Sequence, residues 1–362
     1  MSTIFPMTVY GSDISYFTGK LEMYLRLKGM DYSFEPMVSP RVWNRIVKET
    51  GVQQMPACTL ADGRWVTDTT PLIAWLEAEQ PAPAIVPADP LQRFFCLLVE
   101  DYADEWLWRP AMHYRWWYPE GRAVLGWHLA AELMGEVPLP GPIKRTMIRR
   151  RQLGGFVTGD GVNKQNFRAV EQCYHDNLKW LSAMLESRPY MLGDSPSLAD
   201  VAFMGPMFRH FSQDPIPAEI MRTTAPKVWE WVARVWAAGP QGTKGEWVSG
   251  IPEDWGPLLA DIGATYLPYL CELAEAVRQG KERADLTANG ITYPGARVSP
   301  YRVWCLARLR EEFEALPDEA STEARALLEQ HGCWEPLWRT DLPETDVNVG
   351  CNPPFRSNAT MV

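Results

Sequence analysis

The stretch that most constrains this chain is residues 7–30, MTVYGSDISYFTGKLEMYLRLKGM. Met7 and Val9 alternate with their neighbours as in a strand, and apolar residues then recur from Leu21 onward with the spacing of a helix. The pattern predicts a strand over residues 7–10, a tight connection, and a helix over about residues 17–29. Gly29 fits the end of that helix, because a glycine readily adopts the left-handed conformation found there.

Ser15 lies on the predicted connection, beside the start of the helix. Unpaired backbone N–H groups and the positive end of the helix dipole both favour an anion at such a position. We therefore expect Ser15 to be able to hold a thiolate. The hydroxyls of Tyr16, Thr18 and Ser12 are alternatives, and all four could instead serve only to cap the helix.

Two later parts of the sequence stand out. The first predicts a ligand-binding turn followed by a helix start, and the second predicts a structural helix cap. Residues 54–60 (QMPACTL) precede a short hairpin turn at Asp62 and Gly63, and residues 68–77 (DTTPLIAWLE) open a helix with an acid and a hydroxyl. Residues 192–200 (LGDSPSLAD) contain a Ser197-x-x-Asp200 capping box. Together with the S-x-F-[ST]-x-K step at residues 15–20, these segments resemble the glutathione S-transferase superfamily over about residues 5–240.

The resemblance implies an α/β thioredoxin-like domain followed by an all-α domain, the glutathione S-transferase fold. We expect the first domain at residues 1–80, a proline-rich linker at 81–88, and the helical domain at 89–240 with an insertion at about 119–163. Residues 241–362 extend beyond the compact family pattern and should form additional helices with an irregular tail. Beyond residue 30 the sequence pattern predicts an edge strand at 31–38 and helices at 41–49, 90–118 with a kink at Pro110, about 122–134, 163–187, 256–279, 300–314 and near 321–331.

The resemblance further implies that glutathione is the co-substrate. Ser15 would then stabilise its thiolate, with Tyr16 and Thr18 as the alternatives. If the Met55–Pro56 bond is cis, as in the family, the Met55 backbone can pair with the extended tripeptide.

The remaining glutathione contacts that the resemblance implies come from polar residues on either side of the turn. Asp68 and Thr69 would bind the γ-glutamyl end, although plain helix capping explains them equally well. Gln54 or Gln53 could add a further hydrogen bond to the tripeptide. Asp104 and Asp101 are candidates for reaching its amine.

Candidates for the second-substrate pocket are Phe17 in the first unit and Tyr102, Trp106 and His113 in the helical domain. The last three recur at near-helical spacing, and such a stripe belongs more often to a core than to a pocket. The insertion at 119–163, with its basic stretch 144–151 and its glycine-rich loop, could cover the cleft and select the substrate. A solvated helical face is the commoner explanation of the basic stretch.

The predicted function is a glutathione-dependent transferase that attacks an apolar or aromatic electrophile, in the manner of detoxification enzymes. Conjugation, ether or halide displacement and thiol-assisted isomerisation are all open. The alternative is a non-catalytic module of the same fold that binds a ligand or assembles with a protein. The resemblance also implies a homodimer, with the first helix of the second domain at its interface.

Composition narrows the remaining classes of protein. A net charge of −10 disfavours nucleic acid as a partner, and the sequence has no apolar run long enough for a membrane helix. Its seven cysteines are odd in number and include no C-x-x-C motif, so we expect a reducing, cytoplasmic location and no bound metal.

Overall fold

The computed structural model describes residues 4–37, 39–345 and 347. The chain begins with a four-stranded sheet of strand order β2-β1-β3-β4, made by β1 (Met7–Gly11), β2 (Tyr32–Pro36), β3 (Ala57–Thr59) and β4 (Trp65–Thr67). Strands β1 and β2 are parallel, and the other two pairs are antiparallel. The strand predicted at 31–38 is therefore an edge strand, as its proline required.

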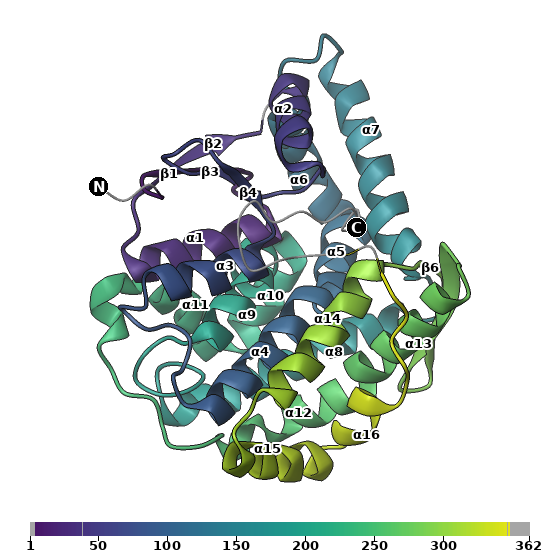
Figure 1. The fold of residues 1–362 in the computed structure, drawn as a ribbon. Coiled ribbons are helices and arrows are strands. Elements are labelled where there is room, and N and C mark those ends of the chain that lie inside the picture. Colours follow the sequence, from purple (N-terminus) through teal and green to yellow (C-terminus); the bar gives the residue numbers. More distant parts are fainter. Residues whose placement is uncertain (1–3, 38, 346, 348–362) are drawn as a thin grey trace.

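Three helices cover the two faces of this sheet (Figure 1). α1 (Tyr16–Lys28) and α3 (Thr69–Glu79) lie together on the face toward the helical part of the molecule, and α2 (Pro40–Thr50) lies on the other face. The alternation of each strand explains this division: Val9, Cys58 and Val66 face the main core, whereas Ala57 and Trp65 pack under α2. This is the predicted thioredoxin-like arrangement.

The predicted ends of α1 are confirmed to within one residue. Ser15 has an extended backbone, and its side chain accepts a hydrogen bond from the Thr18 amide, so it is the N-cap. Gly29 follows the last turn with φ +65°, in the left-handed region that favours glycine.

The helical part contains the eight helices α4 (Pro90–Glu105), α5 (Trp108–Trp117), α6 (Pro119–Met134), α7 (Gly141–Gln152), α8 (Phe167–Ser187), α9 (Leu198–Pro206), α10 (Pro215–Thr224) and α11 (Pro226–Ala238). The single kinked helix predicted over 90–118 is two helices, because the break at Trp106 and Leu107 separates α4 from α5. Pro110 has no N–H to donate to the Trp106 carbonyl, so it fits the first turn of α5 but not the interior of one long helix.

The predicted capping box opens α9 and lies fully inside the protein. Asp200 accepts hydrogen bonds from the Ser197 amide at 2.9 Å, the Met191 amide at 3.0 Å and the Trp231 indole N–H at 2.9 Å. One carboxylate therefore fixes the start of α9, the preceding turn and α11.

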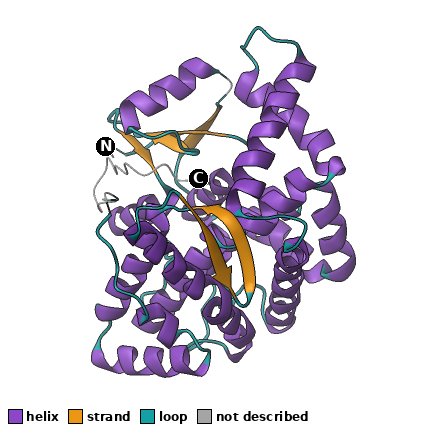
Figure 2. Cartoon of the chain, turned by 90° about the vertical axis from the view of Figure 1, so that its right-hand side faces the viewer, coloured by secondary structure: helices purple, strands orange, loops and turns teal. Residues whose placement is uncertain are grey.

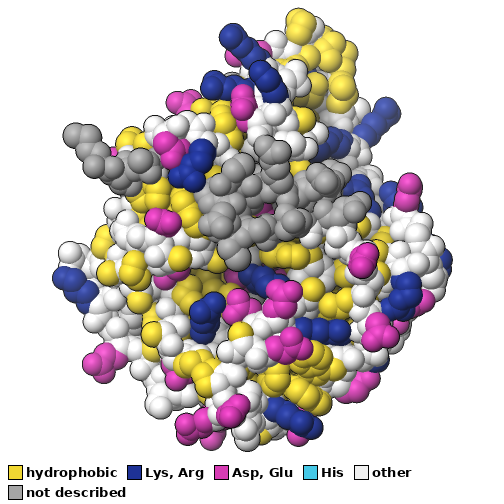
Figure 3. Space-filling view, in the orientation of Figure 1, with side chains coloured by type: hydrophobic (Ala, Val, Ile, Leu, Met, Phe, Trp, Pro, Cys, Tyr) yellow, Lys and Arg dark blue, Asp and Glu magenta, His cyan; other side chains and the backbone are white. Residues whose placement is uncertain are grey.

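The insertion forms a pair of packed helices, α6 and α7, which stands beside α2 (Figure 1). The basic stretch 144–151 belongs to α7, and the glycine-rich segment continues as short π and 3₁₀ turns over 153–160 instead of an open loop. Apolar side chains are exposed on this pair, and Figure 3 shows them gathered toward its outer end. They include Trp127, Ile143 and Met147.

The C-terminal extension contains α12 (Gly256–Asp261), α13 (Leu267–Arg278), α14 (Pro300–Glu314), α15 (Asp318–Gln330) and α16 (Trp334–Trp338). A π segment joins α12 to α13, so the helical stretch predicted at 256–279 is present. The pattern did not predict the hairpin of β5 (Arg283–Ala288) and β6 (Ile291–Arg297), which lies in front in Figure 2. Most of the expected irregular tail lies outside the described residues.

The extension packs along α4 through α14 and α15. Every residue of α4 except Pro90 and Arg93 is buried within this one chain. The expected placement of this helix at a dimer interface therefore needs correction, because the chain's own extension already covers it. A dimer would have to use another surface.

In the part of the chain that the structure describes, no helix is both long enough and apolar enough to cross a lipid bilayer.

Candidate active site

A cleft of about 170 Å³ lies where the ends of the sheet meet the helical part. Its walls come from the β1–α1 connection, the turn before β3, the start of α3, helices α4 to α7 and the start of α14. The predicted residues that line it are Ser15, Tyr16, Phe17, Gln54, Met55, Pro56, Asp68 and Thr69. Three segments that are distant in sequence thus meet in one cavity.

Of the four candidate hydroxyls, that of Ser15 both lines the cleft and lacks an acceptor among the described residues, whereas the Thr18 hydroxyl lacks a partner but is buried away from the cleft. The Ser15 hydroxyl accepts from the Thr18 amide at 3.4 Å and donates to none of the described residues. Tyr16 donates instead to the Ala103 carbonyl, and Ser12 donates to Glu132. Thr18 lies behind the connection against Gly11 and does not line the cleft. The geometry therefore favours Ser15 over the three alternatives.

Two arginines from the helical part hold the connection that carries Ser15. Arg115 donates to the Ile14 carbonyl at 2.7 Å, and Arg209 donates to the Asp13 carbonyl. Arg115 is itself fixed by a bidentate ion pair with the buried Asp214, with Nε–Oδ2 at 2.8 Å and Nη2–Oδ1 at 2.9 Å. The backbone before α1 is therefore set by the second half of the molecule.

The Met55–Pro56 peptide bond is cis, as the resemblance implied. No backbone hydrogen bond of the described residues uses the Met55 amide or carbonyl. The Thr67 hydroxyl contacts both the Pro56 carbonyl and Oε1 of Gln54 at 3.0 Å, which leaves Nε2 of Gln54 buried without a described partner. The turn thus offers peptide groups and an amide N–H₂ to an extended ligand.

Asp68 caps α3 and lines the cleft. Its backbone has φ +72°, and its Oδ1 accepts from the Thr70 amide at 3.3 Å. Its Oδ2 is buried without a partner in the described part of the chain. Burial raises the pKa of Asp68 to about 7, although hydrogen bonds from Tyr301 and Thr70 oppose the shift.

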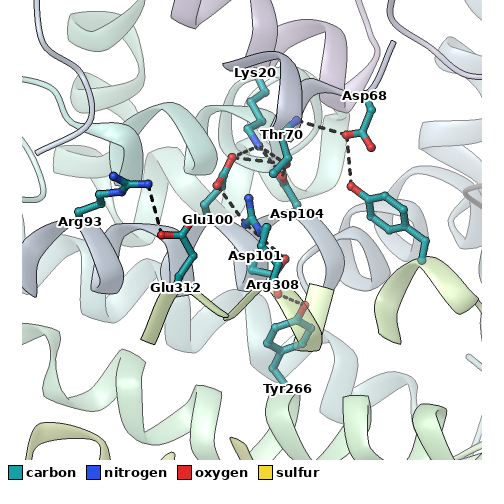
Figure 4. Close-up of polar contacts among 11 residues, drawn as sticks. Lys20, Asp68, Thr70, Arg93, Glu100, Asp101, Asp104, Tyr266, Arg308 and Glu312 are labelled. Carbon is teal, nitrogen blue, oxygen red and sulfur yellow. Dashed lines mark hydrogen bonds and ion pairs between the residues drawn. The ribbon is translucent and has the colours of Figure 1, made fainter. Parts of the chain in front are cut away.

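A buried charge cluster lies near Asp68 (Figure 4). Lys20 of α1 contacts Glu100 at 2.7 Å and also Asp104, both on α4, and the Thr70 hydroxyl at 3.3 Å. Asp104 lines the cleft, whereas Asp101 is bonded to the Tyr266 hydroxyl at 2.7 Å and does not. Burial and the neighbouring Glu100 raise the pKa of Asp104 to about 7 against the opposing charge of Lys20.

Aromatic side chains form the other wall. Phe17 is stacked on Trp108 with ring centroids 5.8 Å apart, and Trp108 meets Phe156 edge to face at 5.7 Å. The indole N–H groups of Trp108 and Trp116 are buried without acceptors among the described residues. This wall suits an aromatic molecule that carries a hydrogen-bond acceptor.

The structure places the other predicted pocket residues inside the helical part, away from the cleft. Tyr102 donates to Asp261 at 2.8 Å, Trp106 packs on Tyr269, and His113 contacts Glu171 at 2.9 Å. All three are buried, so their helical spacing marks a core face. This corrects the expectation that they line the pocket.

Several cleft residues were missed by the sequence reasoning. Trp108, Met112 and Trp116 belong to the same aromatic run as the predicted residues but lie on another face of it. Helical spacing alone does not tell which face meets the cleft. Phe156 and Tyr301 come from the insertion and the extension, and no local pattern placed them at the cleft.

Among the described residues, one group of side chains could hold a metal ion, whereas the sequence predicted no metal site. Ligand atoms of Asp13, His128 and Glu132 lie within 4.8 Å of one another. His128 Nε2 is already 2.7 Å from Asp13 and 3.3 Å from Glu132, so these residues have partners without an ion.

Comparisons with known families agree with this architecture. Residues 9–84 match the family model of the glutathione S-transferase N-terminal domain, and residues 164–234 match that of the C-terminal domain. No protein with a curated description matches the sequence.

Solved structures similar to this chain have low sequence identity to it. A beta-etherase from Sphingobium sp. is 19% identical, with a TM-score of 0.45 over 64% of this chain and 95% of its own. A glutathione S-transferase from Methylobacterium radiotolerans, in complex with glutathione sulfonate, is 17% identical, with a TM-score of 0.40 over 68% and 98%. One from Rhodospirillum rubrum is 18% identical, with a TM-score of 0.42 over 69% and 98%.

Proposed function

The chain belongs to the glutathione S-transferase superfamily, and we propose that it binds glutathione in this cleft and directs the glutathione thiolate to attack an aromatic electrophile. The observation that carries the proposal is the meeting of three features on one wall. These are the Ser15 hydroxyl at the start of α1, the cis turn at Met55, and the carboxylate of Asp68 at the start of α3. They suit the sulfur, the peptide backbone and the γ-glutamyl ammonium of one extended tripeptide.

In this proposal the Ser15 hydroxyl donates a hydrogen bond to the glutathione sulfur and so stabilises the thiolate. A thiol with a pKa of about 8.5 is only about 3% ionised at pH 7, and a pKa of about 6.5 would require about 2.7 kcal/mol of differential stabilisation. A hydrogen bond to a charged sulfur supplies about 1.5–3 kcal/mol, and a helix N-terminus supplies about 0.3–1 kcal/mol. Ser15 and α1 are therefore sufficient for this shift.

Ionisation alone gives little acceleration. Lowering the thiol pKa by about 2 units also lowers the intrinsic nucleophilicity of the thiolate about eightfold, so the net gain is only about threefold. The larger contribution must come from holding the electrophile against the sulfur. The wall formed by Phe17, Trp108 and Phe156 is placed to do this for a flat aromatic group. Conjugation, ether or halide displacement and isomerisation all use the same attack.

The proposal is tested by calorimetry with reduced glutathione and by turnover of a panel of aromatic electrophiles with Ser15→Ala. We expect this variant to raise the pKa of the bound thiol, followed by thiolate absorbance, by about 1–2 units and to lower kcat/KM at pH 7 by up to about threefold through this effect.

Ser39→Ala is the matched control. Ser39 caps α2 through the same 3.4 Å contact with an amide, that of Val42, but it does not line the cleft. It should lose a similar amount of stability and keep its activity. Absence of binding heat, or unchanged turnover in Ser15→Ala, would overturn the proposal, while binding without any turnover would point to a non-catalytic module.

A further inference from the structure

The C-terminal extension contributes one side chain to the cleft, Tyr301 in the first turn of α14. No other described residue after His210 lines this cavity. The Tyr301 hydroxyl donates a 3.2 Å hydrogen bond to Oδ1 of Asp68, and both side chains are buried. A segment outside the compact family pattern therefore touches the proposed glutathione site directly.

Tyr301 is held in place by contacts that are independent of any ligand. The adjacent Arg302 contacts Glu105 at 2.8 Å and the Tyr269 hydroxyl at 2.6 Å. Two turns later, Arg308 lies 3.4 Å from Glu100 (Figure 4). These buried ion pairs fix α14 against α4, so the position of the Tyr301 hydroxyl is set by the fold.

Among the described residues, both hydrogen-bond donors to the Asp68 carboxylate contact the same oxygen atom, Oδ1. The Tyr301 hydroxyl and the Thr70 amide each donate to Oδ1, whereas Oδ2 is buried without a described partner in a residue that lines the cleft. Two donors on one oxygen fix the plane of the carboxylate and leave the other oxygen available to a cation.

We propose that Tyr301 is a positioning residue of the glutathione site, which holds Asp68 so that Oδ2 receives the γ-glutamyl ammonium. This inference rests on the proposed function and extends it, because it makes the C-terminal extension part of the site. Tyr301 acts through Asp68 and takes no part in bond making or breaking.

The hydroxyl also affects the charge of Asp68. Burial raises the pKa of Asp68, and the hydrogen bonds from Tyr301 and Thr70, together with the charges of Lys20 and Arg308, oppose that rise. Asp104, the neighbouring carboxylate on the cleft, remains in either case. Removing the Tyr301 hydroxyl should therefore leave more Asp68 protonated at neutral pH, and this effect should vanish at higher pH.

The test compares Tyr301→Phe with the unchanged protein by calorimetric titration with S-methylglutathione, a probe without an ionisable thiol. We expect binding to weaken about threefold to tenfold at pH 7 and the difference to shrink by about pH 8.5, with kcat at saturating glutathione nearly unchanged. In an Asp68→Asn background, Tyr301→Phe should have little further effect.

Tyr293→Phe is the control, because Tyr293 is equally buried in the same extension and does not line the cleft. Its binding should match that of the unchanged protein. Unchanged or tighter binding by Tyr301→Phe at pH 7, with a normal melting temperature, would overturn the inference and leave the proposed function standing. Absence of binding by the unchanged protein would overturn the proposed function itself.

Discussion

The ammonium group of Lys20 lies 2.7 Å from a carboxylate oxygen of Glu100, and both side chains are almost completely buried. This pair joins α1, which follows the first strand, to α4, which begins the helical part. Asp104 is the second carboxylate on the same ammonium group. The charge cluster therefore fixes the two halves of the molecule against each other next to the cleft, which Asp104 lines.

Replacing Lys20 should destabilise the protein strongly. Lys20→Met leaves Glu100 and Asp104 without their shared cation in a buried site, which typically costs about 3–5 kcal/mol. Denaturant unfolding measures the change. Lys227→Met removes an ion pair whose side chains are 44% and 65% exposed, and it should cost less than about 1 kcal/mol. Equal effects of the two substitutions would contradict the role of the buried cluster.

Binding of the tripeptide should depend on the ionisation of Asp68. Burial raises its pKa to about 7, so the carboxylate loses its proton as the pH rises through that value and can then accept an ammonium. The affinity for S-methylglutathione should rise about tenfold between about pH 6 and pH 8. Asp68→Asn should bind weakly across this range without that rise, which titration calorimetry at each pH can check. A flat profile for the unchanged protein would argue against the contact.

The aromatic wall should determine affinity for the electrophile and leave glutathione binding unaffected. Trp108→Ala removes the ring that is stacked on Phe17, so the KM for aromatic electrophiles should rise about tenfold or more while the Kd of glutathione stays the same. Trp127→Ala is the control, because Trp127 is 45% exposed on α6 and does not line the cleft. Similar loss in both variants would place the electrophile elsewhere.

Asp200 should be far more important for stability than an ordinary helix cap. Asp200→Ala leaves the amides of Ser197 and Met191 and the indole N–H of Trp231 buried without their acceptor, so we expect a loss of about 3 kcal/mol or more. Thermal unfolding of Ser197→Ala should show only about 1 kcal/mol. A loss as small as that in Asp200→Ala would contradict the structural role.

The site should be complete in a single chain. Because the extension encloses α4, the helix that the family resemblance placed at a dimer interface, specific activity should stay constant when the protein is diluted through any dissociation of subunits. Light scattering over the same concentrations reports the oligomeric state. Activity that falls as subunits separate would show that a partner contributes to the site.

Local patterns predicted the first unit of the fold well. Ser15 and Gly29 gave the ends of α1, and Ser197 with Asp200 marked the start of α9, because capping depends on residues only a few positions apart. The hairpin β5–β6 could also have been found, since Asn289 and Gly290 form its turn with φ +47° and φ +72°, a typical two-residue hairpin signal.

The missed parts of the site depend on contacts between distant segments. Helical spacing groups Tyr102, Trp106 and His113 on one stripe, but it does not say which neighbour that stripe meets. Here α8 and the extension cover it. The contact of Tyr301 with Asp68 spans 233 residues, so no local pattern could reveal it.

The enclosure of α4 has a practical consequence for anyone who prepares shorter versions of this protein. Cutting the chain near residue 240 would remove Arg302 and Arg308 and leave Glu105, Glu100 and Asp101 in an opened groove without these counter-charges. Such a fragment would have the length of a compact relative, but α4 would expose acidic side chains that have lost these partners. Expression trials and crystallisation should therefore keep residues 241–342 attached.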